Sequence, residues 1–220
     1  MVRLRIVPVC IVAAILGAAS LAANAQEASP NVQLLAAART GDSAAVVRAL
    51  SQGATPDARN RAGETALVIA LKAGRAELAR QMIDSGTDVN LAAANGVTPL
   101  MAAAHGGHTE IAKILITKGA AVDPVDRLMK NAMTYAAGQG NTEIVRLLLG
   151  TGIDANATYA HSLTALMWAA GYGQTDTVRA LLAAGARADL HDDRGKTALD
   201  IAREGNFPET VKLLEATAKL

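Results

Sequence analysis

Apolar and polar positions recur along most of the chain with a period of 33 residues. One column of this repeat is apolar throughout, and a second column, three residues later, holds only alanine. The first column reads Leu67, Leu100, Met133, Leu166 and Leu199, and the second reads Ala70, Ala103, Ala136, Ala169 and Ala202. Leu34 and Ala37 continue both columns one step back, so the repeated region runs from about residue 30 to the end of the chain.

Each repeat predicts two short helices followed by an extended turn. Two residues before the apolar column lies an N-cap residue, whose side-chain oxygen accepts a free backbone N–H at the start of the first helix. These caps are Thr65, Thr98, Asn131, Thr164 and Thr197. One glycine column ends the first helix and another ends the second, because glycine readily adopts the left-handed conformation found there. The first glycine column reads Gly41, Gly74, Gly107, Gly140 and Gly173, and the second reads Gly53, Gly86, Gly119, Gly152 and Gly185.

Helices of about eight to ten residues are not stable alone in water. We therefore predict an all-α linear array, a solenoid, in which each pair of helices is stabilised by the pairs before and after it. The chain contains one Trp, three Tyr and one Phe, too few aromatic rings to fill an ordinary core. Alanine must fill that role, which requires helices that approach one another closely.

Residues 96–111 (Gly-Val-Thr-Pro-Leu-Met-Ala-Ala-Ala-His-Gly-Gly-His-Thr-Glu-Ile) and the turn Asp88-Val89-Asn90 resemble the ankyrin repeat. The resemblance covers nearly all of residues 30–220 and implies about six helix-turn-helix units joined by β-hairpin-like turns. The approximate units are 30–59, 60–92, 93–125, 126–158, 159–191 and 192–220. In the fourth unit Met129 replaces the turn glycine, so we expect the least regular hairpin around Asp126 to Lys130.

Residues 1–25 have the pattern of a secretory signal peptide. Two arginines within residues 1–5 precede an uncharged apolar stretch, residues 6–23, and Ala23-Asn24-Ala25 forms a small-residue cleavage motif. We expect cleavage after Ala25, which leaves residues 26–220 as a periplasmic or secreted domain of an exported bacterial protein. An uncleaved membrane anchor is the alternative, although the stretch is at the lower length limit and contains Pro8 and Gly17.

Composition excludes several classes of function. Loss of Arg3 and Arg5 from the 21 basic residues leaves 19, against 20 acidic ones, so no nucleic-acid partner is expected. The single cysteine, Cys10, is lost with the signal, so the mature chain has no disulfide, thiolate nucleophile or cysteine ligand for zinc. We expect a monomer that has no cofactor and does not insert into a membrane after cleavage.

Three short patterns imitate ligand sites and are explained better by the repeat. Gly195-Lys196-Thr197 lacks the earlier glycine of a phosphate-binding loop, because Leu190 stands there. His105 and His108 have metal-ligand spacing, but glycines end the helix between them and no third ligand is evident. The run 189–193 lacks the glycine and the last glutamate of a calcium loop. No serine-hydrolase or zinc-protease motif occurs, so we expect no catalytic residue.

The ankyrin resemblance implies that hairpin tips and first helices line one concave surface that binds a protein. Residues at those positions vary between units, as a binding face requires. The candidate binding residues are Asn95, His105, Arg127, Leu128, Lys130, Gln139, Tyr159, His161, Leu163 and Tyr172. The aromatic residues all lie in the second half of the chain, so we expect the partner to dock across the fourth and fifth units.

Tyr135 and Trp168 occupy equivalent positions in adjacent units, and we expect their rings to touch. Two other functions stay open at this point. The chain could be an enzyme on an unusual scaffold, or a membrane-tethered spacer without a dedicated ligand.

Overall fold

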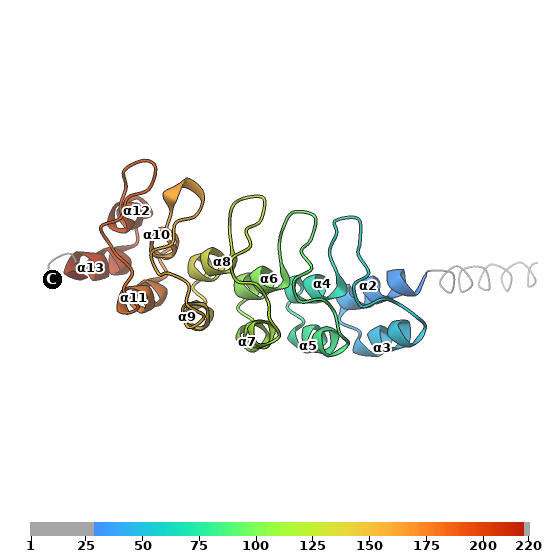
Figure 1. The fold of residues 1–220 in the computed structure, drawn as a ribbon. Coiled ribbons are helices and arrows are strands. Elements are labelled where there is room, and N and C mark those ends of the chain that lie inside the picture. Colours follow the sequence, from blue (N-terminus) through green and yellow to red (C-terminus); the bar gives the residue numbers. More distant parts are fainter. Residues whose placement is uncertain (1–28, 218–220) are drawn as a thin grey trace, which may run out of the picture.

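The computed structural model describes residues 29–217 of the chain, and twelve α-helices in this range pair two by two. The pairs are α2 (Pro30–Thr40) with α3 (Ser43–Ser51), α4 (Ala66–Lys72) with α5 (Ala76–Asp84), α6 (Pro99–Gly106) with α7 (Thr109–Thr117), α8 (Ala132–Gln139) with α9 (Thr142–Leu149), α10 (Ala165–Gly171) with α11 (Thr175–Ala183), and α12 (Ala198–Glu204) with α13 (Pro208–Thr217). Figure 1 shows the pairs side by side in one elongated row, with long hairpins projecting on one side. The predicted all-α solenoid is confirmed, and the predicted signal peptide lies outside the described residues.

The first helix of each repeat begins where the sequence predicts, because its cap is built from local hydrogen bonds. Asn131 Oδ1 accepts the N–H of Thr134 at 3.0 Å, and Thr98 Oγ1 accepts the N–H of Met101 at 3.2 Å. Thr65, Thr164 and Thr197 cap in the same way. The N-cap column of the sequence is therefore confirmed at all five positions.

The glycine that follows a first helix has two functions, as Gly107 illustrates. Its φ of 69° is left-handed, which suits glycine, and a Cβ on it would lie 2.8 Å from Oδ1 of Asn141 in the next pair. That asparagine donates from Nδ2 to the carbonyl of Ala104 at 2.7 Å. The same glycine thus ends one helix and leaves room for a side chain that connects neighbouring pairs.

Equivalent connections recur along the array. His108 Nε2 lies 3.0 Å from the carbonyl oxygen of Leu71, and Gln174 Nε2 donates to the carbonyl of Gly138 at 3.2 Å. Each of these side chains stands just before a second helix and reaches back to the first helix of the preceding pair. At the equivalent place in the last pair stands Phe207, whose ring lies against Gly173.

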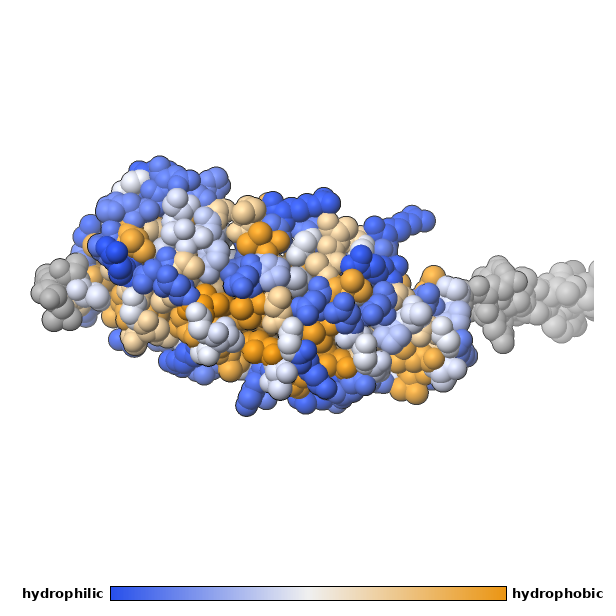
Figure 2. Space-filling view, viewed as in Figure 1, coloured by the Kyte–Doolittle hydropathy of each residue, from blue (hydrophilic) through white to orange (hydrophobic). Residues whose placement is uncertain are grey.

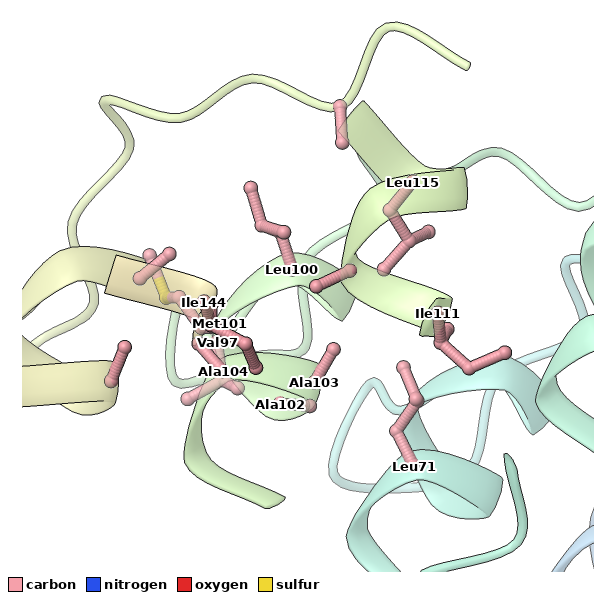
Figure 3. Packing of buried hydrophobic residues seen from close by; sticks show 14 of the residues in the cluster. Leu71, Val97, Leu100, Met101, Ala102, Ala103, Ala104, Ile111, Leu115 and Ile144 are labelled. Carbon is pink, nitrogen blue, oxygen red and sulfur yellow. The ribbon is translucent and has the colours of Figure 1, made fainter. Parts of the chain in front are cut away.

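The core runs through the whole described array as one cluster of buried side chains. The alanine column is 0 % exposed at all five positions, which allows the first helices to lie close together. Figure 3 shows Leu100 of α6 on the same side as Ile111 and Leu115 of α7, and Leu71 of the preceding pair directed toward Ile111. Each pair therefore completes its core with side chains from its neighbours. Within residues 29–217 no helix has the length and apolar character needed to cross a bilayer.

Five hairpins connect the helix pairs, and each is closed by a backbone hydrogen bond from its first to its fifth residue. They span residues 60–64, 93–97, 126–130, 159–163 and 192–196, and we number them second to sixth after the repeat unit that each begins. Neighbouring hairpins are linked where Ala94 N–H donates to Ala62 at 2.9 Å, Arg127 N–H to Asn95 at 3.0 Å and Asp193 N–H to His161 at 3.1 Å. Among the described residues no such bond joins Ala160 of the fifth hairpin to Leu128 of the fourth. The linked series of hairpins is interrupted at that one place.

The prediction that the fourth hairpin is the least regular was wrong. Asp126 Oδ1 accepts the N–H groups of Leu128 at 2.8 Å and Lys130 at 3.0 Å, and this carboxylate keeps the turn regular although Met129 is left-handed with φ 57°. The fifth hairpin is the irregular one. It contains a short 3₁₀ helix, η1 (Ala160–Ser162), with two consecutive left-handed residues. In the regular hairpins a side chain accepts a turn N–H, as Asp126 does for Lys130 and Asn95 does for Val97, and the fifth hairpin has no such bond among the described residues.

Candidate binding groove

Two adjoining cavities lie on the face formed by the hairpins and the first helices. The larger has a volume of about 360 Å³ and is lined by Leu71, Lys72, Asn95, Val97, Met101, Ala102, His105, Gly106 and Tyr135. The smaller has a volume of about 80 Å³ and is lined by His105, Lys130, Thr134, Tyr135, Gly138, Gln139, Trp168 and Tyr172. Because both share His105 and Tyr135, they form one groove, here called the central groove, that runs from α4 to α10.

His105 and Tyr135 form the boundary between the two cavities. Their rings meet edge to face, with centroids 5.5 Å apart and an interplanar angle of 83°. The phenol of Tyr135 donates to Oδ2 of Asp126 at 2.6 Å. Burial, followed by the hydrogen bond and the charge of Asp126, raises the pKa of Tyr135 far above its usual value. Tyr135 is therefore a fixed, neutral hydrogen-bond donor that joins the groove to the fourth hairpin.

Lys130 lies between two aromatic rings rather than beside a carboxylate. Its Nζ is 4.4 Å from the ring centroid of Trp168 and 5.8 Å from that of Tyr135, which are cation–π distances. Trp168 in turn stacks on Tyr172, with centroids 6.1 Å apart and planes 9° from parallel. The predicted contact between the rings of Tyr135 and Trp168 was wrong, because the ammonium group of Lys130 occupies the space over both.

The charged side chains that line the central groove are two lysines, and no Asp or Glu lines either cavity. Lys72 is neutralised by Glu64, since Nζ lies 2.7 Å from Oε1. The hydrogen bond from Lys72 lowers the pKa of Glu64 more than burial raises it, so Glu64 is ionised at neutral pH. Lys130 has no ion-pair partner among the described residues. The groove therefore carries an uncompensated positive charge.

Exposed apolar side chains gather beside this charge. Val125, just before the fourth hairpin, is 40 % exposed, and Leu128 and Met129 on that hairpin are 65 and 54 % exposed. Tyr172 at the end of α10 is 55 % exposed. The other exposed large apolar residues of the described range, Val32 and Val47, lie in the first pair. Figure 2 shows that on the viewed face apolar surface is concentrated in the middle of the array.

The structure brings together half of the candidate binding residues. Asn95, His105, Lys130, Gln139 and Tyr172 line the central groove. Arg127 and Leu128 are exposed at the tip of the adjoining fourth hairpin. Tyr159 and Leu163 instead pack partly against the core, and burial raises the pKa of Tyr159. His161 is exposed at the fifth hairpin, with Nδ1 3.8 Å from Oδ2 of Asp193.

Sequence reasoning did not assign Val97, Met101 or Trp168 to the binding face. Trp168 occupies a column that reads Ile69, Ala102, Tyr135, Trp168 and Ile201. This column varies strongly in size between units, and that variation was a usable signal for a surface-facing position on the first helices.

The polar residues that imitate ligand sites in the sequence can be located in the structure. No group of three or more His, Cys, Asp or Glu side chains within residues 29–217 is placed to hold a metal ion. His108 contacts the carbonyl of Leu71, whereas His105 faces the groove beside Tyr135. The carboxylate of Asp192 accepts hydrogen bonds from the side chain and backbone N–H of Arg194 and from the backbone N–H of Lys196, each at 2.9 Å or less. His108 and Asp192 thus have structural hydrogen-bond partners, whereas His105 faces the groove and His191 is exposed.

One protein family matches this chain over most of its length. The family model described as ankyrin repeats (3 copies) matches residues 33–126, 77–159 and 133–219. These matches overlap and together extend from α2 to the end of α13. No match to the chain is found among curated proteins.

Proposed function

The chain belongs to the ankyrin-repeat family, and we propose that it is an exported interaction module that binds a partner protein across the central groove and the fourth hairpin. Ankyrin repeats generally mediate protein–protein interaction, and such domains are typically non-enzymatic. The fold leaves one continuous face of first helices and hairpins available, which suits a protein partner better than a small substrate.

The observation that carries this proposal is the clustering of aromatic, apolar and basic side chains at one place on the array. Trp168, Tyr172 and Tyr135 lie around Lys130, with Leu128 and Arg127 on the adjoining hairpin. Tryptophan, tyrosine and arginine dominate the binding energy of protein interfaces. Isolated exposed apolar residues are ordinary, whereas a group of them beside a groove marks an interaction surface.

Export is supported by the charge and small-residue pattern of residues 1–25. We propose a role in the cell envelope or outside the cell, with Gln26 as the first residue of the mature chain. A membrane-tethered form would instead retain Met1 or Val2 at its N-terminus.

Site-specific crosslinking in intact cells tests both parts of the proposal. A photoreactive residue at Tyr172 should capture one discrete protein, whereas the same residue at Lys118, exposed at the end of α7, should not. N-terminal sequencing of the crosslinked chain should find Gln26. Equal capture from both positions, or no capture at Tyr172, would contradict the placement of the partner.

A variant with Tyr172→Ala, Arg127→Glu and Lys130→Glu provides the matching loss-of-function control. These side chains contribute little to the core, so the melting temperature should stay within about 2 °C of wild type. Association with the captured protein should be abolished, because the aromatic platform and both positive charges are removed together. Unchanged association would defeat the proposal.

A further inference from the structure

We infer that the central groove binds a protein segment that carries a carboxylate beside an apolar side chain, with the carboxylate on Lys130 and the apolar side chain in the larger cavity. This inference rests on the proposed function and adds the chemistry of the partner. It is carried by the charge of the groove and by the position of its apolar surface.

The carboxylate is assigned from the surroundings of Lys130. Its ammonium group is half-buried, lies 4.4 Å from the Trp168 ring centroid and has no anionic partner in the described part of the chain. The nearest hairpin carboxylate, Asp126, is buried and accepts hydrogen bonds from two backbone N–H groups and from Tyr135. A carboxylate from a partner would meet a preformed, uncompensated charge, and complementary charge gives specificity and fast association.

The apolar side chain is assigned from the larger cavity. Leu71, Val97 and Met101 form its floor, and each is nearly inaccessible, at 1, 7 and 1 % exposure. A volume of about 360 Å³ lies at the small end of the range for ligand pockets. It therefore accommodates a side chain rather than a domain surface. Lys72 at its rim is already paired with Glu64, so this cavity does not require a second anion.

The order of the two subsites follows from their shared wall. His105 and Tyr135 line both cavities, so a carboxylate on Lys130 and an apolar side chain in the larger cavity lie on the two sides of one ring pair. The two groups can therefore belong to one short segment of the partner. Nucleic acid also binds lysine and aromatic rings, but it requires a continuous basic track along its backbone. Only one uncompensated lysine lines this groove.

Selection of random displayed twelve-residue peptides on the full chain tests the inference. Peptides selected on the wild type should carry Asp or Glu close to a large apolar residue. Trp168 is the only tryptophan, so its emission reports docking of the synthetic peptide at the groove without background from elsewhere in the chain. Anisotropy of a labelled peptide gives the affinity for wild type and for every variant.

Lys130→Glu should weaken the selected peptides at least about tenfold, a typical effect for reversing a contact charge. The matched control is Lys118→Glu, which makes the same change of charge outside the groove and should alter affinity less than about twofold. Replacing the acidic residue of the peptide by its amide should weaken wild-type binding and have little further effect on Lys130→Glu. Such non-additivity identifies direct pairing.

Three results would overturn the inference. The first is selection of peptides that have no carboxylate but bind in the groove, which is shown when Tyr172→Ala abolishes their binding. This result would refute the assignment of a carboxylate to Lys130 and would not affect the proposed function. Equal affinity of the acidic peptides for Lys130→Glu and wild type would do the same. A single-stranded oligonucleotide that displaces the peptides would assign the groove to another class of ligand. Recovery of no peptide that depends on Tyr172 would count against the proposed function itself.

Discussion

Met129 occupies the turn position at which three of the other four hairpins have glycine. Its side chain affects how the next hairpin packs. A Cβ at Gly63 would lie 2.7 Å from the backbone nitrogen of Ala94, and one at Gly96 would lie 2.9 Å from Cα of Asp126. In a hairpin of this regular form, a side chain at this position therefore leaves little room for the next hairpin. Ser162 also has a side chain there, but its hairpin contains η1 and still bonds to Asp193. The missing link between the fourth and fifth hairpins thus follows a regular hairpin that carries Met129 in place of glycine.

Met129→Gly is expected to stabilise the protein by about 0.5–1 kcal/mol. The left-handed φ of 57° costs a residue with a side chain about 1–2 kcal/mol, whereas the greater freedom of glycine in the unfolded chain costs about 0.5–1 kcal/mol. Met129 is 54 % exposed, so little buried area is lost. Calorimetry should show a melting temperature about 1–4 °C above wild type.

Met129→Ala is the control, because it shortens the side chain and keeps both the Cβ and the strained backbone. It should not stabilise the protein. In Met129→Gly the backbone amide of Ala160 should also show slower hydrogen exchange, because the fifth hairpin can then contact the fourth. A melting temperature of the glycine variant at or below that of wild type would show that Met129 is not strained.

At the scale of elements, two carboxylates with lowered pKa values support the start of the last helix pair. Asp192 is 6 % exposed and holds the sixth hairpin, of residues 192–196, through the N–H groups of Arg194 and Lys196 at 2.9 Å. Asp200 accepts from the hydroxyl of Thr197 at 2.7 Å and from its N–H at 3.0 Å, at the start of α12. Glu64 in the second pair has a comparable role, but its partner Lys72 is exposed, which weakens the pair.

Acid should therefore loosen α12 and α13 before the middle of the array. Burial raises the pKa of Asp192, but hydrogen bonds from Lys196 and Arg194 outweigh it, and the hydroxyl and N–H of Thr197 lower the pKa of Asp200. Both pKa values thus lie below the ordinary 3.8, so the stabilisation is complete above that pH and is lost as the pH falls through the folded values. Hydrogen-exchange protection factors at about pH 3 and at pH 7 measure the loss for each helix.

The double variant Asp192→Asn, Asp200→Asn provides the comparison for this prediction. It should already be less protected in α12 and α13 at pH 7 and should lose less on acidification, because the titrating groups are gone. Uniform loss of protection from α2 to α13 in the wild type would show that these two carboxylates do not set the acid response.

The elements that the sequence predicted correctly are those whose signals are local. Thr98 caps α6 and Gly107 ends it through bonds to residues a few positions away, and a column repeated with one period identifies such positions without knowledge of the fold. The hairpins were harder to predict. The unusual Met129 was visible, but the carboxylate that keeps its turn regular acts in three dimensions.

Five of the ten predicted candidate residues line the central groove, but few of their contacts were predicted. The position of the aromatic residues in the second half of the chain led to the fourth and fifth units. The position of Lys130 over Trp168 and Tyr135 depends on how the hairpin folds back onto the helices, which no spacing in the sequence specifies. For the same reason Tyr159, similar in composition to Tyr172, was not recognised as a partly buried residue.

At the scale of the whole molecule, the interruption between hairpins does not divide the core. The buried cluster extends from Leu34 to Leu214, and α8 packs on α10 as α6 packs on α8. Arrays of this kind gain stability from the interfaces between neighbouring units. Because those interfaces are intact among the helices, the described array should unfold as one cooperative body at neutral pH.

Urea unfolding followed by two probes tests this cooperativity. Trp168 fluorescence reports on unfolding of the fifth unit, whereas far-ultraviolet circular dichroism reports on all helices. The two unfolding transitions should coincide. Leu148→Ala in α9 removes a fully buried side chain and should cost about 2–5 kcal/mol, shifting both probes by the same amount. Transitions that separate, or a shift in only one probe, would mean that the array breaks into two blocks between the fourth and fifth units.

The back-reaching side chains His108, Asn141 and Gln174 have an implication for how such a chain changes length. Each bonds to a main-chain carbonyl, which every amino acid supplies. Asn141 and Gln174 also need the glycine that ends the preceding first helix, Gly107 or Gly140, and the repeat supplies that glycine. A duplicated or deleted repeat would therefore re-form this bond at the new junction without any compensating substitution. The array can grow or shrink by whole units, and the surface presented to a partner can be extended one helix pair at a time.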